Sequence, residues 1–532
     1  MIASPSFHSP ALKSDQVISP AHGASLASRA CYCSLLVVAF LLVSSASGAT
    51  PRRNVLLILA DDLNNLLGCY GDPLAKTPNL DKLAARGVRF DRAYCNYPLC
   101  GPSRNSFLTG LYPNSTGILA NAQLFRQTIP EQPSMSQAFR QQGYFAGRIG
   151  KLYHYNVPNS IGTNGHDDPA SWELELNPPG VDRLEDHPKI TTLVPKQFGG
   201  TLSWYSSPKP DAEHTDGKMA LDAEWVLERC AKQKDRPFFL AVGFFRPHTP
   251  YVSPKTYFDR HPVAQMKLVQ GVKEDREDIP AAGLASGKEE QDAMTDEQRR
   301  QVLQAYYASI SFLDAQVGRV VDALDRRGLS SNTVIVFTSD HGYHMGEHGL
   351  YQKMSLFEES ARVPLLIVSP GVGKGGVVAK APVSLIDLFP TLAELCGVQA
   401  PGNLQGQSLV AMLRDPASAG RGWALTQVQR SAPGVGAKAK ASAATGRFFG
   451  YSLRTPRWRY TEWGEGAKGR ELYDHDADPK ELKNLAGAAG HAQTVADLSK
   501  QLRAAVKSTY PPSGESPALS PGAMWNPMLV AP

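Results

Sequence analysis

Two pairs of polar residues closely follow apolar runs in this sequence. Asp61 and Asp62 come directly after the run 54–60, and Asp340 and His341 follow a similar run later in the chain. Carboxylate oxygens are the hard ligands that Ca²⁺ and Mg²⁺ take in proteins, whereas a nitrogen ligand such as His341 is unusual on these ions. The pattern predicts a site for one divalent cation. The alternative is that the two adjacent aspartates cap a following helix.

A thiol opens the segment CGPSRNSFLTG, which runs from Cys100 to Gly110. A free cysteine is most often a small buried hydrophobe, and this is the alternative to a chemical role. The chain keeps five cysteines after the leader described below, so at least one thiol is left over if the others pair. Cys100 is the natural candidate for that thiol.

Four apolar runs lack the alternation of half-exposed strands. They are residues 54–60, 238–243, 332–338 and 363–368. The helical patterns between them are residues 79–87, 132–143, 216–234 and 296–328. Because such runs fit strands that helices cover on both faces, the sequence predicts an α/β sandwich with a large, mixed and mostly parallel sheet. Ligands of these folds collect at the carboxyl ends of the strands, where the aspartates lie.

The composition changes in the last quarter of the chain. Residues 431–446 are rich in Ala, Gly, Ser and Lys and are predicted to form a flexible surface loop. The aromatic segment 448–463 is typical of an antiparallel hairpin, and the Pro-rich tail 511–532 is predicted to be an extended wrap or disordered. The sequence therefore predicts a main domain at 50–410, which carries the chemistry, and a smaller α+β subdomain with an antiparallel sheet at 411–532.

Residues 1–49 have the three parts of an export signal peptide. Lys13 and Arg29 are basic, nine apolar residues span Leu35–Val43, and small residues follow. A membrane-spanning helix needs about 20 residues, so a cleaved signal is favoured over an uncleaved anchor and no stable membrane anchor is expected. The protein is predicted to reach a periplasmic, extracellular or lysosome-like compartment, depending on the host. The formal net charge of +5 is too evenly mixed to indicate a nucleic-acid partner, although it does not oppose an anionic substrate.

Taken together, these segments resemble the type I sulfatases of the alkaline-phosphatase superfamily. Residues 100–110 match the family pattern C-x-P-S-R-x-x-x-L-T-G, and further matching segments follow in the same order along nearly the whole chain after the leader. Within the family the sequence looks closest to the iduronate-2-sulfatase branch, because of the Lys-x-x-His spacing at 151–154, the Asp340-His341 pair and the aromatic segment 450–463. The resemblance implies an alkaline-phosphatase-like fold and a sulfuric ester hydrolase.

The resemblance also implies a modified nucleophile and a bound ion. In this family a formylglycine-generating or other maturation enzyme oxidises the cysteine of the pattern to formylglycine. Hydrated formylglycine at Cys100 would attack sulfur and form a covalent sulfated enzyme. One hydroxyl of the hydrate would also bind the cation, together with Asp61, Asp62, Asp340 and His341. The family's ion is usually calcium, and Mg²⁺ is the alternative.

Five further side chains receive roles from the same resemblance. Arg104 would orient the hydrate by charge-assisted hydrogen bonds. Lys151 and Lys353 would hold sulfate oxygens. His154 would take the proton of the second hydroxyl, so that the aldehyde is regenerated, and His248 would contact the sulfate or protonate the leaving oxygen. Taken singly, a lysine or a histidine is more often a solvated or structural group.

The implied partner is a sulfated carbohydrate, and the iduronate branch suggests a uronate 2-sulfate. Two alternatives stay open. One is a phosphonate monoester hydrolase or phosphodiesterase of the same superfamily, which also uses formylglycine. Two lysines and a ligand set for one cation favour sulfate, because phosphate enzymes often assemble two metals. The other alternative is a non-catalytic sugar-binding protein in which Cys100 is never converted.

A uronate substrate would need a cation for its carboxylate. The candidates are Arg246, His344, Arg454, Arg457 and Arg459, and the sequence does not choose among them. Glu347 and His348 lie in the loop that leads to Lys353, and they are expected to support the site from behind its direct ligands.

Overall fold

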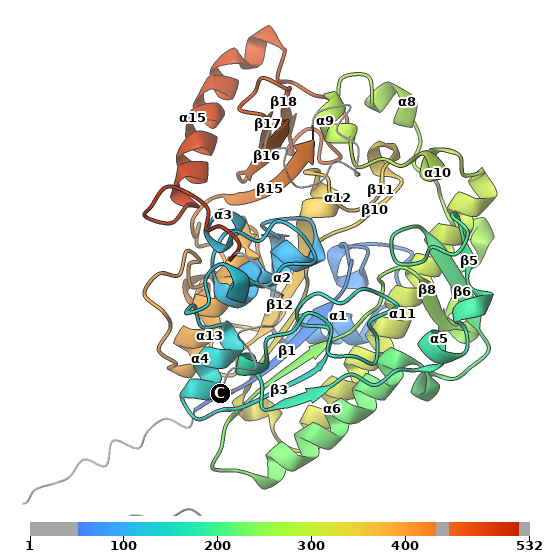
Figure 1. Ribbon diagram of the computed structural model, residues 1–532, viewed down its shortest axis with the longest axis vertical. Coiled ribbons are helices and arrows are strands. Elements are labelled where there is room, and N and C mark those ends of the chain that lie inside the picture. Colours follow the sequence, from blue (N-terminus) through green and yellow to red (C-terminus); the bar gives the residue numbers. More distant parts are fainter. Residues whose placement is uncertain (1–51, 432–445, 521–532) are drawn as a thin grey trace, which may run out of the picture. The chain divides into compact units, whose positions relative to one another are not determined.

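A nine-stranded sheet forms the centre of the protein (Figure 1), whose computed structural model describes residues 52–431 and 446–520. In sheet order the strands are β13 (Val377–Ala379), β2 (Val88–Tyr94), β12 (Arg362–Val368), β9 (Thr333–Ser339), β1 (Asn54–Ala60), β7 (Phe238–Gly243), β3 (Phe145–Gly150) and β4 (Leu174–Leu176), with β14 (Val383–Ser384) also paired to β2. The strands from β9 to β4 are parallel to one another. β12 is antiparallel to both β2 and β9. The predicted mixed and mostly parallel sheet is confirmed.

Helices cover both faces of this sheet. They are α1 (Pro78–Arg86), α6 (Thr215–Lys232) and α11 (Asp296–Arg326) on one face, and α2 (Cys100–Thr109), α4 (Met135–Gln141) and α13 (Leu388–Cys396) on the other. The side chains of β1 alternate between the two hydrophobic cores, with Leu56 and Ile58 in the first and Leu57 and Leu59 in the second. Burial on both faces explains why the strand sequences show no polar alternation.

Short elements complete the main part of the chain. They are α3 (Pro113–Thr116), α5 (Val181–Leu184), α7 (Lys255–Phe258), α8 (Val272–Asp275), α9 (Ala281–Leu284), α10 (Glu289–Asp292), α12 (Glu358–Ala361), α14 (Val410–Arg414), β5 (Thr191–Thr192), β6 (Ser203–Ser207), β8 (Tyr251–Pro254), β10 (His344–Met345) and β11 (Tyr351–Gln352). The long pattern predicted at 296–328 forms the single helix α11. A capping box between Thr295 and Gln298 stabilises the start of this helix. None of the helices described is long and apolar enough to cross a lipid bilayer.

The C-terminal part contains a separate antiparallel sheet. Its strands are β15 (Ala424–Ser431), β16 (Arg447–Arg454), β17 (Trp458–Trp463) and β18 (Arg470–Asp474). Helix α15 (Ala492–Ser508) packs on this sheet through Leu498 and Leu502, which share a core with Leu453 and Tyr460. The predicted hairpin is therefore confirmed as β16 and β17. The domain boundary near residue 411 stays a prediction.

Parts of three predicted segments lie outside the described residues. These are the leader 1–49, residues 432–445 of the predicted loop and residues 521–532 of the tail. The described part of the tail has no helix or strand, and Ser520 donates its backbone N–H to the carbonyl of Gln127 at 2.9 Å. Residues 511–520 thus wrap against the main part of the chain, as an extended tail would.

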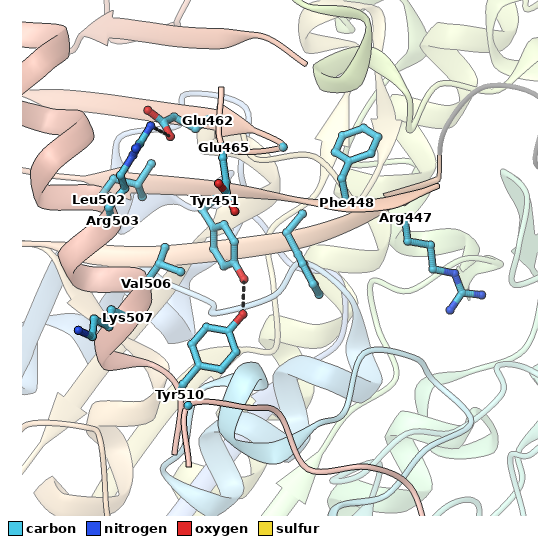
Figure 2. A pocket seen from close by; sticks show the side chains of 13 residues that line it. Arg447, Phe448, Tyr451, Glu462, Glu465, Leu502, Arg503, Val506, Lys507 and Tyr510 are labelled. Carbon is cyan, nitrogen blue, oxygen red and sulfur yellow. Dashed lines mark hydrogen bonds and ion pairs between the residues drawn. The ribbon is translucent and has the colours of Figure 1, made fainter. Parts of the chain in front are cut away.

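A cavity of about 680 Å³ lies beside β16, β17 and α15 (Figure 2). Phe448, Tyr451 and Tyr510 supply aromatic walls, and the hydroxyls of the two tyrosines are 3.4 Å apart. Arg503 and Lys507 reach it from α15. No residue singled out as a catalytic or metal-binding candidate lines this cavity, so it is separate from the site described below.

A buried ion cluster ties the C-terminal sheet to α12. Arg459 of β17 donates to carboxylate oxygens of Glu358 and Glu481, and its Nη1 donates to the carbonyl of Leu356 at 3.0 Å. The Arg459 side chain is 1 % exposed. Because water cannot replace these partners, removal of the guanidinium would take from Glu358 and Glu481 a buried counter-charge that they share.

Replacement of Arg459 by methionine is expected to lower the free energy of unfolding by about 3–5 kcal/mol, the usual result of breaking a buried ion pair from one side. Arg503→Met is the matched control, because that arginine is 60 % exposed and lies 3.7 Å from Glu462. Urea unfolding of both variants measures the difference. Equal stability of the two variants would contradict this role of the cluster.

Candidate active site

The candidate residues meet at the carboxyl ends of four adjacent parallel strands. Asp340 and His341 follow β9, and Asp61 and Asp62 follow the next strand, β1. His248 follows β7, and Lys151 and His154 follow β3. The register pairs Ala60 with Ser339, which brings Asp61–Asp62 and Asp340–His341 to the same level of the sheet. The backbone N–H of Asp62 also donates to Oδ1 of Asp340 at 3.2 Å. The topology therefore assembles segments that lie far apart in the sequence.

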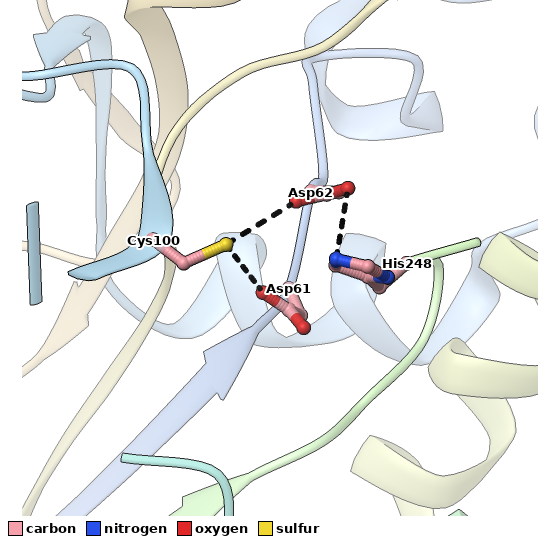
Figure 3. A group of neighbouring side chains, drawn as sticks. All are labelled: Asp61, Asp62, Cys100 and His248. Carbon is pink, nitrogen blue, oxygen red and sulfur yellow. Dashed lines mark hydrogen bonds and ion pairs between the residues drawn. The ribbon is translucent and has the colours of Figure 1, made fainter. Parts of the chain in front are cut away.

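The carboxylates form a compact and buried group of potential metal ligands (Figure 3). Asp61, Asp62, Cys100 and His248 each offer one atom within 4.8 Å of the others, and Cys100, Asp340 and His341 form a second such group. Within the described chain Oδ2 of Asp62 is buried and accepts no hydrogen bond. Burial of a carboxylate oxygen without a hydrogen-bond donor costs folding free energy unless a cation binds that oxygen. The donor set fits one hard divalent ion, with three carboxylates as its principal ligands.

Helix α2 begins at Cys100 and carries its thiol into this group. The Sγ atom lies 3.3 Å from Nε2 of His341 and 3.2 Å from Nζ of Lys353. It lies 3.7 Å from Oδ1 of Asp61 (Figure 3). Burial would raise the pKa of the thiol, but the charges of Lys151 and Lys353 hold it well below its ordinary value. Residue 100 therefore sits where an anionic oxygen nucleophile would also be stabilised.

Arg104 follows Cys100 by one turn of α2 and crosslinks the site. Its Nε donates to Oδ2 of Asp340 at 2.8 Å, and its Nη2 donates to Oδ1 of Asp61 at 3.0 Å. Nη1 donates to the carbonyl of Lys151 at 2.6 Å. Within the described chain these hydrogen bonds go to the two aspartates and to backbone carbonyls, not to the side chain of residue 100. Arg104 thus fixes the carboxylates that surround the nucleophile position.

Two lysines supply positive charge beside the carboxylates. Nζ of Lys151 lies 2.6 Å from Oδ2 of Asp61, and Nζ of Lys353 lies 2.6 Å from Oδ1 of Asp62. Burial opposes the charge of Lys353, but Asp62 outweighs it and raises the pKa of that ammonium. Lys353 lines the pocket described below, whereas Lys151 is completely buried beside Asp61. Their role in holding ester oxygens stays a prediction.

Two histidines complete the predicted set. Nε2 of His248 lies 3.3 Å from Nζ of Lys353 and 3.6 Å from Oδ2 of Asp62. Burial, together with the positive charge of Lys151, lowers the pKa of His154 to about 4. At neutral pH the ring of His154 is therefore uncharged and able to accept a proton. The structure thus brings all ten predicted site residues together around one point.

A pocket of about 420 Å³ leads to this point, and His154, His248 and Lys353 lie in its wall. Its other lining residues are Leu99, Asn121, Tyr155, Asn156, Val157, Gly199, Gly200, Ala285, Ser286, Lys288, Gln352, Met354 and Arg430. Besides Lys353, the lining contains two histidines, His154 and His248, and two basic residues, Lys288 and Arg430. It contains no Asp or Glu. An electropositive pocket of this kind favours an anionic substrate.

The cations considered for a substrate carboxylate lie elsewhere. Arg246 pairs with Asp182 at 2.7 Å, and Nε2 of His344 lies 2.6 Å from the hydroxyl of Ser355. The other three pair with acids outside the pocket, Arg454 and Arg459 with Glu358 and Arg457 with Asp474. Lys288 and Arg430 line the pocket instead, and sequence reasoning missed both.

The loop residues Glu347 and His348 do not line the pocket either. Oε2 of Glu347 accepts from the backbone N–H of Met345 at 2.7 Å, and Nδ1 of His348 lies 3.0 Å from Oδ2 of Asp275. These contacts hold the loop that leads to Lys353. Their role in supporting the site stays a prediction.

Comparison with known proteins identifies the class. Residues 53–398 match the sulfatase family, and residues 346–508 match the C-terminal region of N-sulphoglucosamine sulphohydrolase. The chain belongs to the sulfatase family, and the protein is a sulfuric ester hydrolase with an alkaline-phosphatase-like fold. The predicted resemblance to type I sulfatases is confirmed.

Individual relatives are similar along most of the chain. A sulfatase of Formosa agariphila is 33% identical over 453 residues, which cover 82% of this chain and 83% of that protein. Human iduronate 2-sulfatase is 30% identical over 526 residues, which cover 83% of this chain and 92% of that protein. The solved structure of a phosphonate monoester hydrolase of Agrobacterium radiobacter superposes with a TM-score of 0.70 at 25% identity, covering 86% of this chain and 96% of that one.

Proposed function

We propose that the protein removes sulfate from a sulfated, acidic sugar, with residue 100 acting as formylglycine. The observation that carries this proposal is that Cys100 and Arg104 converge on one group of buried carboxylates. Two lysines and two histidines, Lys151, Lys353, His154 and His248, converge on the same group. The similarity to an iduronate 2-sulfatase supports a uronate 2-sulfate as the substrate. The pocket wall, which has cations and no acid, supports a substrate with more than one negative charge.

A single calcium ion is the proposed cofactor, with Mg²⁺ as the alternative. Asp61, Asp62, Asp340, His341 and residue 100 would hold it, in keeping with the unsatisfied oxygen of Asp62. When bound, the ion would neutralise charge that develops on the ester oxygens during cleavage. Oxygen ligands of this number and hardness suit calcium better than a transition metal.

The proposed reaction has two steps. One hydroxyl of the formylglycine hydrate releases its proton to water, its oxygen attacks sulfur, and the bond from sulfur to the sugar oxygen breaks. His248 gives a proton to the leaving sugar oxygen, while Lys151 and Lys353 hold the sulfate oxygens. His154 then takes the proton of the second hydroxyl, the bond from carbon to the sulfated oxygen breaks, and the aldehyde and free sulfate are formed. Addition of water to the aldehyde restores the hydrate.

Maturation and export belong to the same proposal. Every residue of α2 is buried in the folded chain, including Cys100. A formylglycine-generating or other maturation enzyme would therefore have to act on residues 100–110 before the chain has folded. The leader at residues 1–49 would direct the protein through the secretory pathway, and the catalytic domain at 50–410 would be completed by the subdomain at 411–532.

The matured protein is expected to cleave 4-nitrophenyl sulfate with a kcat/KM at least about 100-fold above that for a 4-nitrophenyl phosphonate monoester. Both esters carry one negative charge, so the ratio measures how well the site fits the reacting group. Release of 4-nitrophenol measures both reactions. The opposite ratio would favour a phosphonate monoester hydrolase, which the structural similarity to such an enzyme makes the second candidate. Protein whose Cys100 stays an unconverted cysteine, and which binds sulfated glycans but cleaves neither ester, would favour the non-catalytic alternative.

A further inference from the structure

One arginine in the wall of the catalytic pocket has no acidic partner. Arg430 lies near the end of β15 and is only 7 % exposed. Its Nε donates to the carbonyl of Ala282 at 3.1 Å, its Nη2 donates to the carbonyl of Met354, and its guanidinium lies 5.2 Å from the ring centre of Trp463. The remaining N–H groups of this guanidinium have no hydrogen-bond or ion-pair partner in the described chain.

The other buried arginines of the described chain are all paired with carboxylates. They are Arg104, Arg126, Arg148, Arg246, Arg454 and Arg459. A buried cation without a counter-charge is costly, so it is rarely kept unless a ligand supplies the opposite charge. The burial lowers the pKa of Arg430 to about 10, and the side chain therefore still carries its charge at neutral pH.

Glu471 is an acid whose charge acts on Arg430, but its carboxylate is committed to other partners. Its carboxylate accepts hydrogen bonds from Nε1 of Trp463 and from the hydroxyl of Tyr473. Burial raises the pKa of Glu471 to about 7, so the group is only partly ionised at neutral pH. Glu471 therefore does not supply a full counter-charge for Arg430.

Lys288 is a second cation in the same wall. Its Nζ donates to Oε1 of Gln352 at 2.6 Å and to the carbonyl of Gly200, and no carboxylate of the described chain forms an ion pair with it. Burial lowers the pKa of this ammonium. Arg430 and Lys288 line the same 420 Å³ pocket as His154, His248 and Lys353, which leaves the pocket with positive charge that the sulfate being cleaved does not need.

We propose that Arg430, assisted by Lys288, binds a second anionic group of the substrate while the reacting sulfate lies at residue 100. This inference rests on the proposed function and adds a recognition site to it. The second group is a carboxylate or another sulfate on the same sugar or its neighbour, because either one presents oxygens that match the planar donor array of a guanidinium. Arg430 and Lys288 would thus select acidic or multiply sulfated sugars over neutral sugars with one sulfate.

The test compares matched substrates that differ by one charge. One arm uses a 2-O-sulfated uronate disaccharide and its methyl ester, and the other uses glucosamine with two sulfates and with one. The measured quantity is the ratio of kcat/KM for the more charged member to that for the less charged member. In at least one arm the wild type is expected to show a ratio of about 10 to 100, and Arg430→Gln is expected to bring it close to one. Arg430→Lys should retain part of the ratio.

The two arms distinguish a carboxylate from a second sulfate. Substitution of Arg430 changes the ratio of kcat/KM values only in the arm whose extra charge the protein binds. Arg503→Gln, which changes an exposed arginine outside the pocket, is the control and should leave both ratios unchanged. If Arg430→Gln does not fold, Lys288→Gln and the wild-type ratios still test the subsite. A wild type that cleaves both members of each pair with equal kcat/KM overturns the subsite.

An unchanged ratio in Arg430→Gln overturns it as well. A wild type that cleaves no sulfate ester contradicts the proposed function itself, whereas cleavage of 4-nitrophenyl sulfate without charge discrimination contradicts the subsite alone.

Discussion

Replacement of Cys100 by alanine is expected to reduce kcat/KM for 4-nitrophenyl sulfate by a factor on the order of 10⁴ or more, the size of effect seen when a covalent nucleophile is removed. Alanine has neither the thiol that a maturation enzyme oxidises nor an oxygen that could attack sulfur. The small side chain fits the position, which is completely buried at the start of α2. Initial rates and the melting temperature, measured together, separate chemistry from folding.

Cys230→Ala is the matched control for this experiment. Cys230 is another free and buried thiol, but it lies on α6, and burial raises its pKa to about 12. This variant should keep the activity of the wild type within a few-fold. Retention of most of the activity by the Cys100→Ala protein would rule out residue 100 as the nucleophile.

Asp62→Asn is expected to lower kcat by about 10³-fold, because the substitution removes a charged ligand from an ion that stabilises several kcal/mol of developing charge. Oδ2 of Asp62 has no hydrogen-bond donor in the described chain, and Oδ1 lies 2.6 Å from Nζ of Lys353. An asparagine would place an amide against that ammonium or at the ion. The bound ion should be lost, and elemental analysis of the purified protein measures its content directly.

The control here is Asp325→Asn. Asp325 pairs with Arg86 at the surface at 2.9 Å, with 41 % of its side chain exposed. Such a pair contributes little to stability, so the variant should keep both the ion and the activity. Wild-type protein should contain one divalent ion per chain and lose activity with a chelator. An Asp62→Asn protein with full ion content and full activity would show that the carboxylate group is not the metal site.

Much of the fold could be predicted because burial on both faces leaves a local signature. The runs at 54–60 and 238–243 correspond to β1 and β7 without a change of boundary. β12 begins one residue before its run, and β9 is shifted from its run by one residue at both ends. Strand direction has no such signature. The antiparallel placement of β12 between β2 and β9 depends on how the chain returns to the sheet, which hydrophobicity does not encode.

The aspartates of the site could be predicted for a related reason, whereas Cys100, Arg104, Lys151, His154, His248 and Lys353 were assigned by the family resemblance. Residues that follow parallel strands must meet at one edge of the sheet, so the positions after β9, β1, β7 and β3 converge whatever lies between them in the sequence. Arg430 and Lys288 have no comparable signal. An arginine in a strand and a lysine before a short helix look like ordinary surface residues, and only the packing of β15 against Met354 and Trp463 buries the first of them.

Arg454 and Arg459 were two of the five cations that the sequence offered for a substrate carboxylate. In the structure both guanidinium groups lie within ion-pair distance of Glu358 of α12. Arg459 also pairs with Glu481, but Glu358 lies about a hundred residues before both arginines, so their pairing with it depends on tertiary structure. Ion pairs of this kind decide which arginines of a chain remain free for a ligand.

Peptide mass spectrometry across residues 100–110 of catalytically active protein tests the central claim most directly. The account predicts that the thiol of Cys100 has been replaced by an aldehyde, that a hydroxylamine probe labels this residue, and that activity rises in proportion to the labelled fraction among preparations. Full sulfatase activity in protein whose residue 100 is entirely unmodified cysteine would contradict the account, since no hydrate would then be available to attack sulfur.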